Sequence, residues 1–212
     1  MKNMMKKTLA ILIVVSLVLA MAGCGGGSGG SSGAKKSGLS TNGFFGAVPA
    51  VYADHDLAFD ALKEKRDKAQ EEALKSQNAK AYQNAEDEYD KAWDELDAKF
   101  EADKKAAWEK IKGKDVEFST SAKFNAFTVS SLKVDEEEGY LIAGISNLKS
   151  ADNIFGIVYF SYRALAKDGS VISDPHQLIL SGNNKDKIVT YINREPEKWV
   201  DFAKIEFISE DE

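Results

Sequence analysis

The sequence predicts an α+β protein in which a charged helical segment precedes an all-β, immunoglobulin-like antiparallel sandwich. Residues 54–112 are rich in charged side chains and contain neither glycine nor proline. Beyond Gly113 the chain changes to short runs of branched and aromatic residues separated by turn-forming residues. The predicted organisation is a signal peptide at 1–23, a lipidated flexible tether with an apolar patch at 24–53, a charged helical segment at 54–113 and a β-sandwich at 114–212.

The first 23 residues have the order of features that is typical of an export signal. Lysines at positions 2, 6 and 7 precede an apolar run, Leu9 to Ala20, which only Ser16 interrupts. The run is shorter than the roughly 20 apolar residues of a membrane-spanning helix. An uncleaved anchor helix and a plain secreted protein are the alternatives to a cleaved signal.

The segment Met21-Ala22-Gly23-Cys24 resembles the lipobox of bacterial lipoproteins. This resemblance implies that Cys24 receives a diacylglyceryl group, that the signal is cut before it, and that acyl chains such as palmitate hold the protein in a lipid bilayer. Stable anchoring takes two such chains or signals. The expected location is the extracytoplasmic face of the cell membrane.

Composition limits the partners and the chemistry of the exported chain. Loss of a signal with three lysines and no acidic residue would leave 25 of the 28 basic residues against 34 acidic ones, a net charge of about −9. Such a body is repelled by nucleic acid, so we expect no nucleic-acid partner. Cys24 is the only cysteine, which excludes a disulfide framework and a cysteine-based metal site.

Two different segments lie between the signal and the helices. Gly25 to Lys36 is a flexible tether because glycine and serine dominate it. An apolar patch follows at 43–53 and contains Phe44, Phe45 and Val48. Docking of this patch on the folded body is favoured over insertion into the membrane interface, and both remain open from the sequence.

The predicted helical segment has recognisable ends. Asp54 and Asp56 suit its first turn and Gly113 suits its end. Acidic residues precede lysines by four positions at five places, where ion pairs on a helix surface are expected: Glu64–Lys68, Glu71–Lys75, Asp87–Lys91, Glu95–Lys99 and Glu101–Lys105.

Two apolar stripes decide between one helix and two. Along one straight helix they would lie on nearly opposite sides, so neither would be well buried. Weak helix formers between Leu74 and Lys80 allow the chain to reverse there, and the sequence therefore predicts a helical hairpin. The alternative is one coiled-coil-like helix of about 59 residues and roughly 90 Å. The stripes are Ala58, Phe59, Leu62, Ala69 and Ala73, and Tyr82, Ala85, Tyr89, Trp93, Leu96, Phe100, Ala107 and Ile111.

Two tryptophans in this segment are candidates for contacts outside the helices. An aromatic stripe is more often core than ligand site, but one flank of Trp93 lacks an obvious cover. Trp108 lies off the main line of its stripe. It is expected either to pack on the sandwich or to anchor a partner protein.

Six or seven strands are expected after Gly113, and Asp168-Gly169 is a strong hairpin signal between two of them. Only a short stretch at 195–201 is expected to be helical, which favours a sandwich. The expected strands are Val116–Thr120, Phe124–Val134, Tyr140–Leu148, Ile154–Lys167, Leu178–Leu180, Ile188–Asn193 and Lys204–Ile208.

Three runs in this region, 141–147, 158–162 and 167–172, resemble the immunoglobulin-like FxLYD-type modules of bacterial surface lipoproteins. The resemblance covers roughly Val129 to Phe207, and Ser161-Tyr162-Arg163 stands where the family has leucine-tyrosine-aspartate. Such modules are accessory or binding domains without a known catalytic site, which is what the resemblance implies here.

Residues able to perform chemistry are few. His55 begins the helical segment, and His176 follows Asp174 in an expected turn. Neither has the histidine or cysteine neighbours of a metal or acid–base site. The acidic run Asp135–Glu138 lacks the alternating ligands of a calcium loop and is expected to be an exposed connection. We expect no cofactor, no metal and no catalytic residue.

Two classes of function remain after these exclusions. The favoured class is a non-catalytic binding or scaffolding lipoprotein of the bacterial cell envelope. Its partners would be the bilayer, through acylated Cys24, and either another envelope protein or a cell-wall polymer. The alternative is an envelope hydrolase or enzyme subunit that uses carboxylates, which can work in pairs on glycans.

Overall fold

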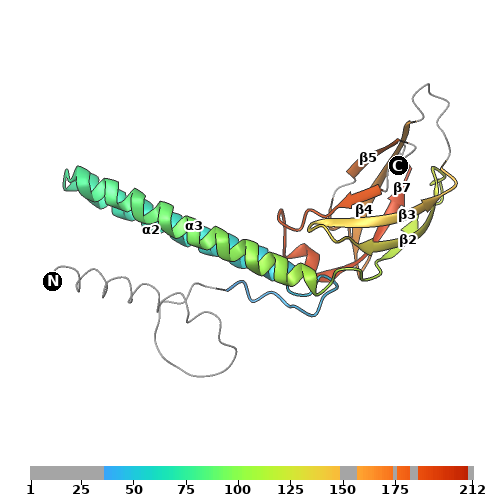
Figure 1. Ribbon diagram of the computed structural model, residues 1–212, viewed down its shortest axis with the longest axis horizontal. Coiled ribbons are helices and arrows are strands. Elements are labelled where there is room, and N and C mark those ends of the chain that lie inside the picture. The colour runs from blue at the N-terminus through green and yellow to red at the C-terminus, as the bar shows by residue number, and fades with distance from the viewer. Residues whose placement is uncertain (1–35, 149–156, 174–175, 182–185, 210–212) are drawn as a thin grey trace, which may run out of the picture. The chain divides into compact units, whose positions relative to one another are not determined.

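The computed structural model describes residues 36–148, 157–173, 176–181 and 186–209, and it has the α+β architecture that the sequence predicts. Two helices precede two small β-sheets (Figure 1). The elements are α2 (Val48–Lys75), α3 (Ala79–Glu109), β1 (Glu117–Thr120), β2 (Thr128–Val134), β3 (Tyr140–Ser146), β4 (Ile157–Ala166), β5 (His176–Ser181), β6 (Asp186–Val189), η2 (Lys198–Asp201) and β7 (Phe202–Ile208).

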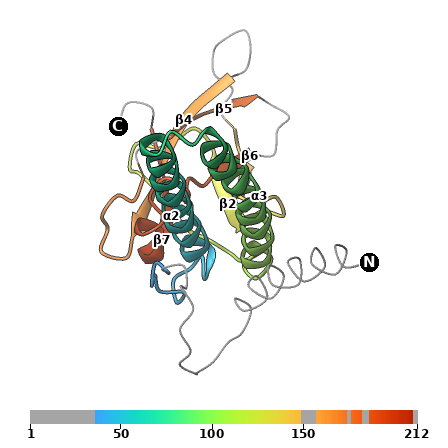
Figure 2. The ribbon, with the colours of Figure 1, turned by 90° about the vertical axis from the view of Figure 1, so that its left-hand side faces the viewer.

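The two helices form the predicted hairpin, and the single long helix is wrong. Figures 1 and 2 both show α2 and α3 side by side. The reversal takes three residues, in which Gln77 adopts a left-handed φ of 50° and the amide of Asn78 donates to the Ala73 carbonyl at 2.8 Å. The Asn78 side chain then caps α3 by accepting from the Ala81 amide at 3.0 Å.

The facing stripes of the hairpin hold it together. Aromatic pairs cross from one helix to the other: the ring centroids of Phe59 and Trp93 are 4.8 Å apart, and those of Tyr52 and Phe100 are 5.1 Å apart. Nearer the turn, Ala73 and Ala85 are buried, and small side chains there let the helices approach.

The start of α2 differs from the prediction. The helix begins at Val48, not Asp54, with Pro49 in its first turn and no side-chain cap. Asp54 does not cap the helix; instead its carboxylate accepts a hydrogen bond from the Ser37 amide at 2.6 Å. The apolar patch is therefore part of the helix and its approach, and the expected boundary between residues 53 and 54 falls inside α2.

Two of the five expected ion pairs are present on the helix surface, Glu64–Lys68 at 2.5 Å and Glu71–Lys75 at 2.6 Å. The lysines at 91 and 99 instead pair with acids that follow them, Glu95 and Asp103. Exposed pairs of this kind contribute little to stability, so choosing one partner over another costs little.

The strands divide into sheets of order β1-β7-β4-β5 and β2-β3-β6. Side chains from both sheets share one core, including Leu132, Leu141, Phe160, Ile188 and Phe207. All seven expected strands are present with shifted ends, and the first residues of the expected 154–167 strand lie outside the described ones.

The expectation of a purely antiparallel sandwich is wrong at one edge. β1 pairs with β7 in parallel, with Glu117 opposite Lys204 and Thr120 opposite Phe207. Both strands start near the helices, because β1 follows α3 directly and β7 starts at Phe202, whose ring packs on Phe45. Two neighbouring strands that leave the same end of a sandwich must run in the same direction.

The left-handed conformation of Gln77 gives a testable prediction. Because a side chain in this conformation costs about 1–2 kcal/mol, Gln77→Gly should raise the free energy of unfolding by about 0.5–1 kcal/mol, measured by urea denaturation. The matched control is Gln83→Gly inside α3, which should lower it by about 1 kcal/mol. Equal losses in both variants would contradict the proposed strain at the turn.

Candidate functional site

The expected lipidation residue, Cys24, lies outside the described residues. Within the described ranges, no helix combines sufficient length with the apolar composition that crossing a bilayer requires.

Trp108 lies at the junction between α3 and the sandwich. Its side chain is 2% exposed, and its indole N–H donates to the carbonyl of Asp135 at 3.2 Å. Its ring stacks on that of Phe45, with centroids 6.3 Å apart. Of its two expected roles, the structure gives Trp108 the interdomain contact, and a buried side chain cannot serve as an exposed anchor for a partner.

The apolar patch docks on the body at the same junction. Phe45 is fully buried and packs against Trp199 and Phe202 with ring centroids 5.4 and 4.9 Å away. Phe44 also packs on Phe202, at 5.4 Å, and on Phe45 itself, at 5.0 Å. Edge-on and tilted ring pairs at these distances stabilise the fold by more than the burial of their apolar area alone. Phe45 therefore joins the start of the helices to the end of the sandwich.

Two glycines make room for this contact. A Cβ atom on Gly43 would lie 2.2 Å from the carbonyl oxygen of Val200, so the two backbones touch there. Gly46 has a left-handed φ of 57°. The pattern Gly43-Phe44-Phe45-Gly46 thus combines two aromatic side chains with the close approach and the turn that seat them.

Trp93, the second candidate, belongs to the interior of the hairpin. It is half-buried, and its ring lies 4.8 Å from that of Phe59 and 5.9 Å from that of His55. His55 also lies against Phe100, 4.2 Å away between ring centroids. The helix that starts at Val48 puts His55 on its inner face, so this histidine is part of the packing between α2 and α3.

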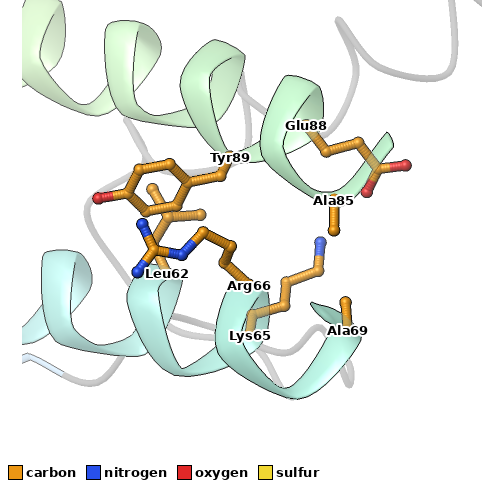
Figure 3. Close-up of a pocket in the computed structure, with 7 residues that line it drawn as sticks. All are labelled: Leu62, Lys65, Arg66, Ala69, Ala85, Glu88 and Tyr89. Atoms are coloured by element: carbon orange, nitrogen blue, oxygen red, sulfur yellow. The ribbon is translucent and has the colours of Figure 1, made fainter. Parts of the chain in front are cut away.

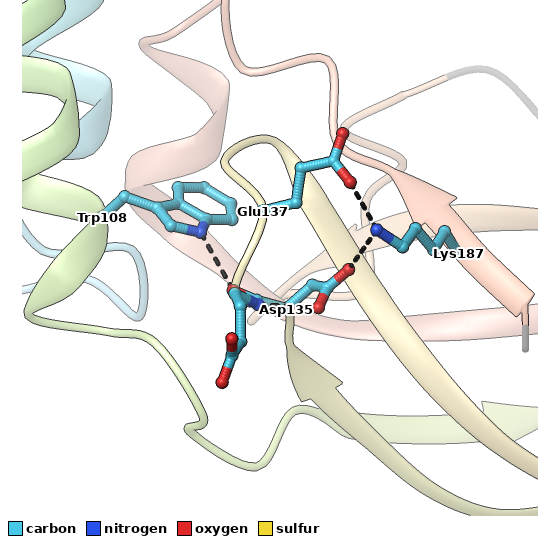
Figure 4. A network of polar contacts seen from close by, with 5 residues as sticks. Trp108, Asp135, Glu137 and Lys187 are labelled. Carbon is cyan, nitrogen blue, oxygen red and sulfur yellow. Dashed lines mark hydrogen bonds and ion pairs between the residues drawn. The ribbon is translucent and has the colours of Figure 1, made fainter.

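The acidic run 135–138 connects β2 to β3 as expected, and Glu136 and Glu137 are exposed, but its first residue is buried. Asp135 is only 8% exposed, and its Oδ2 lies 3.0 Å from Lys187 Nζ, which also pairs with Glu137 (Figure 4). From α3, Lys104 Nζ lies 3.7 Å from Glu138. Together with the Trp108 hydrogen bond, these contacts make the turn after β2 the polar part of the junction.

The charge of Asp135 is maintained despite its burial. Burial by itself would raise the pKa of the carboxyl group, but the Lys187 ammonium and the Glu136 amide outweigh it, so the pKa lies below its ordinary value. The Glu136 amide donates to Asp135 Oδ1 at 2.7 Å. A carboxyl group held ionised in this way stabilises the turn and is poorly suited to act as a general acid.

His176 belongs to a row of planar groups at one end of β5. Its ring centroid lies 5.4 Å from that of Tyr162 and 4.5 Å from that of Tyr191. The guanidinium of Arg194 stacks on Tyr191, 4.5 Å from the ring centroid. Burial raises the pKa of Tyr162, whose hydroxyl donates to the Val189 carbonyl at 2.7 Å.

A cavity of about 70 Å³ opens beside this row, and it is the strongest candidate for a binding site. Its lining residues are Ile172, Ser173, His176, Tyr191, Arg194, Glu195 and Trp199. The sequence pointed to His176 as part of a solvated turn but gave no sign of Arg194, Tyr191 or Trp199. Each of these lies between β6 and β7, and only the fold brings that segment to the start of β5.

No metal centre forms among the described residues, where no three histidine, cysteine, aspartate or glutamate side chains gather. Asp174, which precedes His176 closely in sequence, lies outside the described ranges. Comparison of the chain with known protein families, curated proteins and solved structures found no match.

The burial of Phe45 can be tested against its neighbour. Phe45→Ala should lower the free energy of unfolding by about 3–5 kcal/mol, because it leaves a cavity among buried rings. Phe44→Ala is the matched control and should cost about 1–2 kcal/mol, since Phe44 is only half-buried. Urea unfolding measures both. Equal costs would mean that the junction does not depend on Phe45.

The pairing of Asp135 with Lys187 predicts a pH dependence. Because the folded-state pKa of Asp135 is lowered, its contribution is present above the ordinary value of 3.8 and is lost as the pH falls through the folded-state value. Asp135→Asn should therefore cost about 1–2 kcal/mol at pH 7 and progressively less below about pH 4.

A matched control for this effect is Asp115→Asn. Asp115 also pairs with a lysine, Lys133, at 3.5 Å, but its side chain is 84% exposed. Its substitution should change the free energy of unfolding by less than about 1 kcal/mol at either pH. If Asp135→Asn costs the same at pH 3 and pH 7, the charge of Asp135 does not stabilise the turn.

Proposed function

We propose that this protein is an exported, membrane-anchored lipoprotein that serves as a non-catalytic binding or scaffolding module at the bacterial cell envelope. The anchor is the acylated Cys24, which places the body on the extracytoplasmic face of the membrane. The observation that carries the proposal is the burial of Phe45, which fastens the end of the tether into the folded body.

The attachment of the chain near Phe45 limits the distance between the folded domains and an anchor at Cys24. From Ser37, whose amide bonds to Asp54, the chain is attached to the helices. About a dozen glycine- and serine-rich residues lie between Cys24 and this point, for which the sequence predicts a flexible tether, and a random coil of that length would span roughly 20 Å. Such a connection suits a module that works close to the bilayer.

The two folded parts suit different tasks. The sandwich has a core of its own, in which Phe127, Phe160 and Phe207 lie within 6.1 Å of one another between ring centroids. The hairpin buries aromatic rings between its helices and carries ion pairs on its outer surface. A solvated hairpin of this kind acts as a spacer or docking surface, and the sandwich acts as the recognition domain.

The lowered pKa of Asp135, the most buried acidic residue among those described, favours a binding role over catalysis. General acids on glycans need a raised pKa. Asp135 has a lowered pKa and is held by Lys187 within the junction. Its environment therefore supports a structural role.

The anchor is tested by Cys24→Ala in cells fed a labelled fatty acid. Because only the thiol can accept the diacylglyceryl group, the variant should incorporate no label and should accumulate as an unprocessed precursor. Ser28→Ala, in the same tether, is the matched control and should be labelled and processed normally. Labelling and maturation of the Cys24 variant would refute the lipoprotein assignment.

A further inference from the structure

The cavity beside His176 is large enough for a small chemical group. Its volume is about 70 Å³, several times the roughly 10–15 Å³ that one water molecule requires. Its walls are of two kinds: Ile172 and Trp199 are buried apolar residues, whereas Ser173, His176 and Arg194 are polar. A group that fits must therefore have both a polar and an apolar part.

Arg194 supplies a cation for which the described residues provide no acidic partner. The other two arginines of the chain pair with carboxylates, Arg66 with Asp67 at 2.7 Å and Arg163 with Glu206 at 2.6 Å. Among the described residues, no carboxylate pairs with Arg194. A guanidinium presents parallel N–H donors that match the two oxygens of a carboxylate.

The turn that carries Arg194 sets the position of its backbone, and the exposed side chain stacks on a tyrosine ring. Its backbone amide donates to the Tyr191 carbonyl at 3.0 Å, which folds the chain back and places the guanidinium 4.5 Å from the Tyr191 ring centroid. The same ring also contacts His176, with ring centroids 4.5 Å apart. Stacking restrains the guanidinium beside the cavity before any ligand arrives, which lowers the entropic cost of binding.

Ser173 adds a hydroxyl donor to the same cavity. Its Oγ already accepts a hydrogen bond from the Ala164 amide at 3.3 Å, so its proton is directed elsewhere. The rim also carries Glu195, which pairs with Lys198 at 2.7 Å. Because Glu195 is neutralised by Lys198, Arg194 is the one unneutralised permanent charge among the described lining residues, which suits a ligand with a single negative charge.

We propose that this cavity binds a carboxylate group that ends a small apolar unit, either the C-terminus of a peptide or a free organic acid. Arg194 holds the carboxylate, the Ser173 hydroxyl donates to it, and the apolar part rests on Ile172 and Trp199. The assignment extends the proposed binding function and rests on it, because it names the ligand chemistry of the sandwich. Its test uses no acyl label, so its failure and that of the anchor are distinguishable.

The experiment is a titration of the full-length protein in detergent micelles, followed by NMR signals of the His176 ring and the Trp199 indole. Three probes are compared at constant ionic strength: propionate for a free acid, N-acetylalanine for a peptide C-terminus, and N-acetylalaninamide as the uncharged control. We expect saturable shifts with the acids and none with the amide. The tighter of the two acids identifies the source.

Arg194→Gln should weaken the binding of the better acid roughly tenfold or more, because it removes a charge-assisted hydrogen bond. Arg66→Gln is the matched control, since Arg66 is also stacked on a tyrosine ring, 4.4 Å from the centroid of Tyr89 (Figure 3), but is paired with Asp67. It should leave the affinity within about twofold. Thermal unfolding of both variants shows whether each is folded.

Four results would overturn the proposal. They are equal shifts with the amide, no saturation with either acid, unchanged affinity in folded Arg194→Gln, and tighter binding of inorganic phosphate that depends on Arg194. The last would replace the carboxylate by a phosphate as the ligand of this cavity.

Discussion

The burial of Phe45 is the contact on which the arrangement of this protein depends. Its ring lies among those of Trp108, Trp199 and Phe202, which come from the end of the hairpin and from the segment that leads into β7. Removing four large apolar surfaces from water at one place provides the free energy that joins the helices to the sandwich. The close approach of Gly43 to Val200 makes this burial possible.

Polar contacts at the junction set the orientation of the hairpin relative to the sandwich. Trp108 donates to the backbone of Asp135, and Lys187 holds the Asp135 carboxylate from β6, so one turn is bound by α3 and by the neighbouring strand (Figure 4). Apolar packing alone is non-directional and would allow several orientations. Hydrogen bonds and ion pairs have preferred geometries, and they select one of these orientations.

Trp199 links the junction to the candidate binding site. Its ring packs on Phe45 and Phe202, and it also lines the cavity that holds Arg194 and His176. The apolar patch that contains Phe45 and the proposed ligand site therefore share one side chain. This arrangement places recognition at the end of the sandwich that is fastened to the rest of the chain.

The sequence by itself determined the α+β order, the hairpin break near Ser76 and the strands, because helix and strand periodicity and turn chemistry are local properties. Only the tertiary structure decided that Phe45 docks, that Asp135 is buried, that β1 runs parallel to β7, and that Arg194 and His176 line one cavity. These features join residues far apart in the chain. Their energies come from packing and charge pairing across that distance, which no local pattern records.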